Sequence, residues 1–186
     1  DEIVRQVQEK IHLSTISGVK IDYLTLVPDG EPTLDLNLGE LISRLKTLNL
    51  PVAVISNGSL IDRAEVQEAL SSADWVSLKV DSVDEKDWHR INRPHRRLSL
   101  PVILEGIQAF KQRYNGTLVT ESMLATGIND SPSTINKLRD YLCELQPHKA
   151  YLALPIRPPA ETWVKPPDRT RLAEILAAFS EKVPFL

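Results

Sequence analysis

The sequence predicts an α/β protein in which parallel strands and helices alternate within one domain. Its 186 residues are a length typical of a single domain that buries its own core. Each interval between successive strand-like segments holds one helical pattern. Repeating units of about 30 residues of this kind favour parallel strands joined by right-handed crossovers. The five strand-like segments start at Ile21, Val52, Trp75, Thr117 and Ala150.

The composition excludes several classes of protein. Hydrophobic residues make up 42% of the chain and charged residues 25%, which is typical of a globular protein and argues against disorder. The 13 Pro and 7 Gly exclude a collagen-like or Gly-rich linker protein. A net charge of −3 excludes a globally basic nucleic-acid binder but is compatible with a local basic patch.

Cys143 is the only cysteine in the sequence. One cysteine excludes an intrachain disulfide, and it excludes a metal or iron–sulfur site built from several cysteines of this chain. Because Cys143 lies beside Leu138 and Leu142 in a helical stripe, we expect it in the core. No apolar run approaches the roughly 20 residues that span a bilayer, and we expect a cytoplasmic protein with no membrane partner.

Periodicity places the elements of the first half of the chain. Apolar residues at Ile3, Val7 and Ile11 form the stripe of an amphipathic helix. Asp62 followed by Glu65 resembles a capping box that opens a helix. The expected elements are a helix around 3–11, a strand over 21–27, a helix over 38–48, a strand over 52–56, a helix after 62 and a strand over 75–81.

Prolines place most elements of the second half. Pro101 and Pro132 each suit the first turn of a helix. Four prolines make the segment 157–167 a loop, and Asp168 is placed to cap a last helix. The expected elements are a polar stretch over 82–98, a helix from 101, a strand over 117–124, a helix from 131, a strand over 150–156 and a helix after 168.

Charged, hydroxyl and amide residues gather at the carboxyl ends of all five predicted strands. Periodicity alone does not separate an open doubly wound sheet from an arc of a (β/α) barrel, but in both folds ligands bind at those ends. The sequence therefore predicts a polar pocket there. Its candidate residues are Asp29, Gly30, Glu31, Ser56, Asn57, Ser77, Lys79, Asp81, Glu121, Met123, Asn129, Asp130 and Arg157.

Three of these charges stand inside or directly after otherwise apolar strands. Lys79 and Asp81 follow a run with Val76, Leu78 and Val80, and unpaired burial of either would cost several kcal/mol. One interpretation is a salt bridge between them or with a neighbour. The other is that they line a lumen and meet a polar ligand. The same two interpretations apply to Glu121.

Residues 89–97 form the one basic run of the sequence. It is either a solvated loop or an anion clamp for a substrate phosphate or an RNA backbone, because the guanidinium fork of Arg suits phosphate. Arg93 and His95 are the candidate substrate-binding residues of this run. Arg157 is flanked by prolines that would hold its loop stiff, and we expect it to contact substrate as well.

The ordered set of motifs resembles the radical S-adenosylmethionine (SAM) superfamily over nearly the whole chain. The similarity is to the branch of the wyosine-base (tRNA-modifying) synthases and their uncharacterised Fe–S oxidoreductase relatives. The motifs that carry it are Gly30-Glu31-Pro32-Thr33-Leu34, Ser56-Asn57-Gly58, Ile91-Asn92-Arg93-Pro94-His95, Gly127-Ile128-Asn129-Asp130, and Arg157-Pro158-Pro159 with Trp163.

The resemblance implies a partial (β/α)6 TIM-like barrel and a [4Fe–4S] cluster with SAM on its fourth iron. In the family, a CxxxCxxC loop after the first barrel strand holds the cluster, and this sequence contains no such loop. We therefore expect residues 1–186 to be a single radical SAM core domain fragment that lacks the first strand. Alone it would be inactive, it would depend on an external electron donor when complete, and it would self-associate.

The resemblance also implies roles for individual residues around SAM. The family's Gly-Gly-Glu turn contacts the SAM ammonium, and here it reads Asp29-Gly30-Glu31, without the first Gly. Ser56 and Asn57 would lie near SAM. The residues Ser77, Lys79 and Asp81 would reach its ribose or carboxylate, and Glu121 would stand on a strand that approaches the adenine. The sequence identifies no catalytic side chain and no metal ligand.

The resemblance implies a function as well. A complete enzyme would cleave SAM reductively to a 5′-deoxyadenosyl radical, with tRNA base modification as the candidate reaction and tRNA as the candidate partner. Two alternatives of another class are a non-catalytic α/β module that binds a nucleotide-like ligand, and a scaffold.

Overall fold

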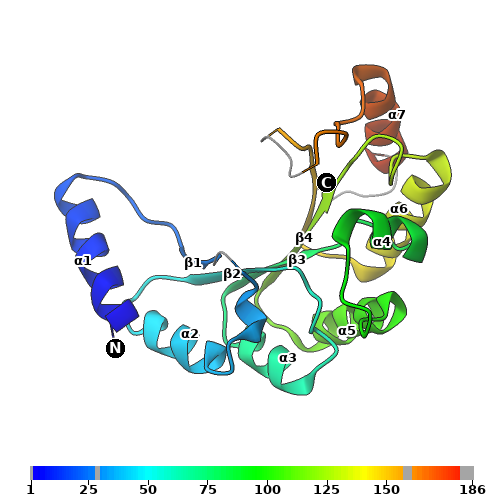
Figure 1. Cartoon of the computed structure of the whole chain (residues 1–186). Helices are drawn as coiled ribbons and strands as arrows, with labels where there is room; N and C mark the ends of the chain where they lie inside the picture. Colours follow the sequence, from blue (N-terminus) through cyan, green and yellow to red (C-terminus); the bar gives the residue numbers. More distant parts are fainter. Residues whose placement is uncertain (1, 28–29, 157–160, 181–186) are drawn as a thin grey trace.

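The computed structural model describes residues 2–27, 30–156 and 161–180. Helices and strands alternate along the chain as the sequence predicts, except that two helices and not one separate the third and fourth strands (Figure 1). The elements are α1 Glu2–Ile16, β1 Leu24–Leu26, the 3-10 turn η1 Pro32–Leu34, α2 Leu38–Lys46, β2 Val52–Ser56, α3 Ala64–Ser71, β3 Trp75–Lys79, α4 Glu85–Asn92, α5 Leu100–Arg113, β4 Thr117–Met123, α6 Pro132–Leu145, β5 Lys149–Ala153 and α7 Arg169–Ser180.

The five strands form one parallel sheet in the order β1-β2-β3-β4-β5. A doubly wound sheet would reverse its strand order at a switch point, so this sequential order is that of a barrel arc. Figure 1 shows the sheet curved, with α2, α3, α5 and α6 over its convex side. The prediction of parallel βα units is confirmed, and the barrel arc is the alternative that the structure supports.

Alternation along the strands separates a buried face from an open one. Val54, Leu78 and Leu118 are fully buried on the side that the helices cover. Ile55 and Tyr151 are 40% and 43% exposed, since residues with alternate positions on a strand point to opposite faces of the sheet. The concave face is therefore accessible, and the strand ends open onto it.

Three predictions about local structure are corrected. α3 begins after Arg63, whose side chain makes no capping bond, so the capping box at Asp62 is wrong. β1 pairs over three residues only, within the predicted strand 21–27. The polar stretch 82–98 contains α4, which the Asp84 carboxylate caps by accepting from the backbone N–H of Lys86 (3.1 Å).

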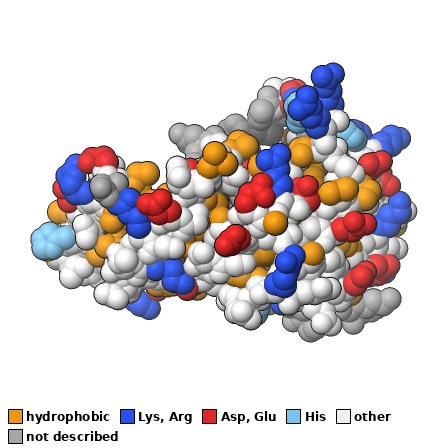
Figure 2. Space-filling model, turned by 90° about the horizontal axis from the view of Figure 1, so that it is seen from below, with side chains coloured by type: hydrophobic (Ala, Val, Ile, Leu, Met, Phe, Trp, Pro, Cys, Tyr) orange, Lys and Arg blue, Asp and Glu red, His pale blue; other side chains and the backbone are white. Residues whose placement is uncertain are grey.

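The surface carries charges of both signs. The face in Figure 2 shows acidic and basic side chains interspersed with hydrophobic ones, and neither sign dominates it. This distribution agrees with the net charge of −3. Within the described ranges, no helix is long and apolar enough to cross a membrane.

Gly106 is a point of close packing between α5 and the loop before α3. A Cβ at this position would lie 2.9 Å from the Asp62 backbone N and 3.0 Å from its Cα. We predict that Gly106→Ala destabilises the fold by about 1–3 kcal/mol, because backbone has to move. Gly39→Ala is the matched helical control: its Cβ meets Ala69 at 3.4 Å, so we predict neutral or slightly raised stability. Chemical denaturation of both variants measures the change in the free energy of unfolding. Equal losses of stability in the two variants would contradict close packing at Gly106.

The outer edge of β1 has no strand partner among the residues that the structure describes. Leu24 donates its N–H to Pro51 O on the β2 side, so the N–H of Thr25 points to the outer edge. Because open edges pair with other chains, we predict that the 186-residue chain self-associates. Thr25→Pro removes one edge donor and should shift the chain toward monomer in sedimentation velocity. A wild type that stays monomeric at high concentration would contradict the prediction.

Candidate functional site

The Glu31 carboxylate ties the end of β1 to the end of β2. Its Oε1 accepts hydrogen bonds from Thr33 N (3.1 Å), Thr33 Oγ1 (2.8 Å) and Ser56 Oγ (2.7 Å), and its Oε2 accepts from Asn57 N (2.7 Å). Pro32 opens the turn η1 directly after it and restricts the backbone. The carboxylate is therefore held in one orientation, and Oε2 retains capacity for a further donor.

Lys79 stands between two carboxylates at the end of β3. Its Nζ lies 3.2 Å from Glu121 Oε1 and 3.6 Å from Asp81 Oδ1. The register sets the first pair, since Lys79 and Glu121 are Cα partners on β3 and β4. The salt bridges that the sequence left open are thus present. The side chains of Lys79 and Glu121 are still 29% and 44% exposed, so both can also meet a ligand.

The Asp81 carboxylate is buried, and both of its oxygens accept hydrogen bonds from the protein. Its side chain is 1% exposed. Oδ1 accepts from the backbone N–H of Met123 (2.7 Å), and Oδ2 accepts from Asn92 Nδ2 (2.7 Å). Burial raises the pKa of the Asp81 carboxyl above its ordinary value, against the opposing effect of the Lys79 ammonium. Contact between Asp81 and a ribose stays a prediction, and because the side chain is 1% exposed it would require neighbouring groups to move.

Asn129 completes this arrangement from the loop after β4. It is fully buried, and its Nδ2 donates to Asp81 O and to Met123 O, each at 2.7 Å. Its Oδ1 accepts from Ala125 N (2.8 Å). We call Asp81, Asn92, Met123 and Asn129 the Asp81 clamp. The sequence placed Asn129 near the pocket but not in this role. The only local signal is Gly127, whose positive φ of 68° turns the loop back under the strand end.

The basic run 89–97 is only partly a loop. Its first four residues belong to α4, and Arg93 caps that helix in the left-handed conformation with φ 47°. The Arg93 guanidinium pairs with Glu161 (2.8 Å), which also accepts from Trp163 Nε1 (3.2 Å). His95 Nδ1 accepts from Arg97 N (3.3 Å). The contact between Arg93 and Glu161 connects α4 to the segment after β5.

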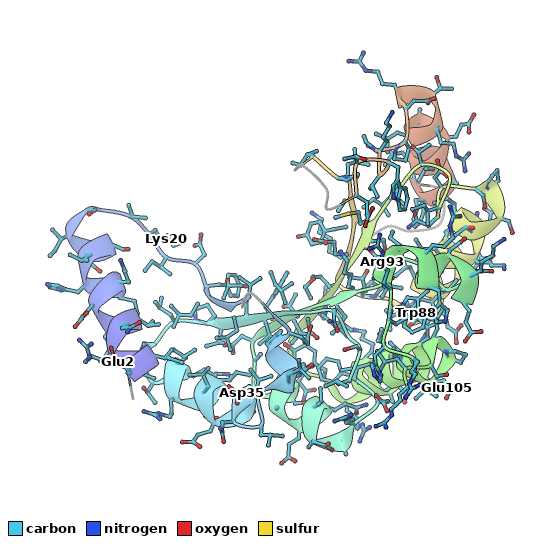
Figure 3. All side chains as sticks on the ribbon, in the orientation of Figure 1. Glu2, Lys20, Asp35, Trp88, Arg93 and Glu105 are labelled. Atoms are coloured by element: carbon cyan, nitrogen blue, oxygen red, sulfur yellow. The ribbon has the colours of Figure 1, made fainter. Side chains whose placement is uncertain are left out.

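A cavity of about 250 Å³ lies among the ends of β2 and β3, α4 and α5. Asn57, Lys79, Asp81, Arg93 and His95 line it together with apolar side chains of α4 and α5. In Figure 3, Trp88 and Arg93 lie close together on the α4 side of the sheet. The structure thus brings five of the predicted site residues to one cavity. Glu31 lies outside it and is hydrogen-bonded to the backbone of Asn57, which lines it.

The remaining predicted residues are distributed around this centre. Ser56 and Ser77 are buried at 3% and 5% exposure, and Gly30 lies beside Glu31 in a separate apolar groove along β1. Asp29 and Arg157 lie outside the described residues, so their roles stay predictions.

Metal-binding geometry is absent from the described part of the chain. No group of three or more His, Cys, Asp or Glu side chains there is arranged to hold a metal ion. Cys143 lies on α6, half-buried and packed against the core, as its helical position predicted.

Comparison with known proteins gives one family. The model of the radical SAM superfamily matches residues 1–138. The UPF0026 protein MJ1312 of Methanocaldococcus jannaschii is 47% identical over 181 residues, which cover 97% of this chain and 56% of the relative. A UPF0026 protein of Helicobacter pylori is 37% identical over 140 residues, 74% of this chain and 45% of the relative. The chain thus spans about half the length of these curated relatives.

Among solved structures, that of TYW1 with a lysine-pyruvate adduct bound has a TM-score of 0.72 and 18% sequence identity, and the match covers 96% of this chain and 58% of that one. This likeness supports the barrel arc. With the family model matching well over half of its residues, the chain belongs to the radical SAM superfamily.

Proposed function

We propose that this chain is the SAM-binding part of a radical SAM enzyme that cleaves SAM reductively to a 5′-deoxyadenosyl radical. The observation that carries the proposal is the Glu31 carboxylate, which four hydrogen bonds orient at a strand end. An oriented carboxylate with a free acceptor site suits the SAM ammonium.

The neighbouring residues match the other groups of SAM. Lys79 is a cation for the SAM carboxylate, and the SAM carboxylate can replace Glu121 or supplement it, because that pair is partly exposed. Asn57 lies next to Glu31 and offers an amide. In this proposal Asp81 acts mainly by orienting Lys79, and a hydrogen bond to the ribose diol is its second role.

The residues of this chain do not fit the iron–sulfur cluster that the family implies. Such a cluster is held by several Cys thiolates, and the sequence has one cysteine, which lies on α6 beside the core. This chain therefore accounts for binding and orienting SAM. The cluster, its thiolates and the electron donor are contributions from outside these residues.

For the substrate we propose a nucleotide, with a tRNA base as the candidate. The support is local charge: Arg93 and His95 line the cavity next to the SAM residues. Because the net charge of the chain is −3, binding of RNA would depend on this basic segment.

Replacement of Glu31 tests the SAM site. A hydrogen bond to a charged group contributes roughly 1.5–3 kcal/mol, so Glu31→Gln should weaken SAM binding about 10- to 150-fold at ~1.4 kcal/mol per decade. Asp81→Asn should weaken it less, because its amide still accepts from Met123 N and Asn92 can rotate its own amide to match. Calorimetric titration of the 186-residue chain with SAM measures both affinities, and thermal melts without SAM report folding.

Two outcomes would contradict the assignment. Unaltered SAM affinity in both variants would remove these residues from the site. SAM binding without release of 5′-deoxyadenosine, in a complete enzyme that combines this chain with a reduced cluster, would favour a non-catalytic binding module.

A further inference from the structure

The cavity beside the Asp81 clamp has two kinds of wall. Trp88, Leu98 and Ile103 make one side apolar. The other side and the mouth carry polar groups, among them Asn92 and Arg93. At about 250 Å³ the cavity is smaller than the roughly 300–1,000 Å³ typical of sites for drug-sized ligands. It therefore fits one compact ring system rather than an extended cofactor.

Asn92 lines this cavity, and the orientation of its side-chain amide is defined. Its Nδ2 donates to Asp81 Oδ2 at 2.7 Å, and an ionised carboxylate only accepts, so the orientation of the amide is fixed. Asn92 Oδ1 must then face away from Asp81. That oxygen is buried and accepts no hydrogen bond from the described residues. Because a buried acceptor without a donor costs free energy, this position favours a ligand that carries an N–H group.

Two exposed residues of the basic run, Arg93 and His95, line the same cavity. The Arg93 side chain is 59% exposed and pairs with Glu161, which is 40% exposed. Exposed ion pairs of this kind are weak, so an anionic ligand can take the place of the Glu161 carboxylate. His95 also lines the cavity. An anion attached to the buried ring would thus meet Arg93 and His95.

From this arrangement we infer that the cavity binds one nucleotide, with the base against the apolar wall and an N–H of the base donating to Asn92 Oδ1. The phosphate lies on Arg93 and His95. Only one part of this inference rests on the proposed function, namely that the bound nucleotide is the substrate. Binding itself requires neither SAM nor a cluster. The contacts come from Asn92, Arg93 and His95, and not from Glu31, the residue proposed to hold the SAM ammonium.

The test is a titration of the 186-residue chain without SAM or iron. The probes are the four nucleoside 5′-monophosphates, the matching nucleosides and ribose 5-phosphate, followed by amide and side-chain NMR shifts and by calorimetry. We expect at least one monophosphate to shift the Asn92 side-chain amide and the backbone amides of 93–95. Its nucleoside should bind several-fold more weakly, and ribose 5-phosphate more weakly still.

Variants test the contacts to the phosphate and the contacts to the base separately. Arg93→Ala should weaken the monophosphate about three- to tenfold and leave the nucleoside unchanged. Arg5→Ala is the matched control, since Arg5 is 58% exposed and also pairs with an exposed glutamate; it should change neither. Asn92→Ala should weaken both ligands. If that variant unfolds in a thermal melt, the comparison of the monophosphate with ribose 5-phosphate still tests the base pocket.

The inference is overturned if no monophosphate binds at millimolar concentration, if ribose 5-phosphate binds as well as any monophosphate, or if the shifts centre on Glu31, which does not line this cavity. Glu31→Gln distinguishes it from the proposed function. SAM affinity that Glu31→Gln leaves unaltered would count against the proposed function alone, whereas nucleotide binding that Glu31→Gln abolishes would place both ligands in one site and end this inference.

Discussion

The buried Asp81 carboxylate connects the carboxyl ends of the strands in this barrel arc. Asp81 connects β3 to the backbone of Met123 on β4 and to Asn92 at the end of α4. Asn129 adds two donors to the same strand ends. A parallel sheet leaves the ends of its strands without ladder partners, so side chains must supply these bonds. The position of Lys79, the orientation of the Asn92 amide and the shape of the cavity all depend on this clamp.

The two acidic residues Glu31, after β1, and Asp81, after β3, thus have different roles. Asp81 is 1% exposed and uses both oxygens within the protein. Glu31 is half-buried, and within the described residues its Oε2 accepts one hydrogen bond, from Asn57 N. Hydrogen bonds anchor both carboxylates, but they differ in how easily a ligand can reach them. A ligand ammonium can reach the half-buried Glu31, whereas a ribose can reach Asp81, at 1% exposure, only if the groups packed around it move.

The sequence predicts the fold better than it predicts the site. Strand 52–56 and the helices opened by Pro101 and Pro132 were predictable because apolar periodicity and proline act locally. α4 was missed because its residues are polar and only its capping residue Asp84 marks it. The Asp81 clamp could not be predicted from the sequence for another reason. Asn92 and Asn129 are 11 and 48 residues away from Asp81 in the chain, and only packing brings them together.

Hydrogen exchange at the Met123 amide tests the clamp most directly. If its bond to Asp81 Oδ1 is as strong as others to charged acceptors, Asp81→Ala should speed exchange of this amide about 10- to 150-fold relative to that of Thr120 in the middle of β4. Asp84→Ala, which removes an acidic residue near the same strand end but outside the clamp, should leave the ratio unchanged. Equal exchange at Met123 in wild type and Asp81→Ala would contradict the account.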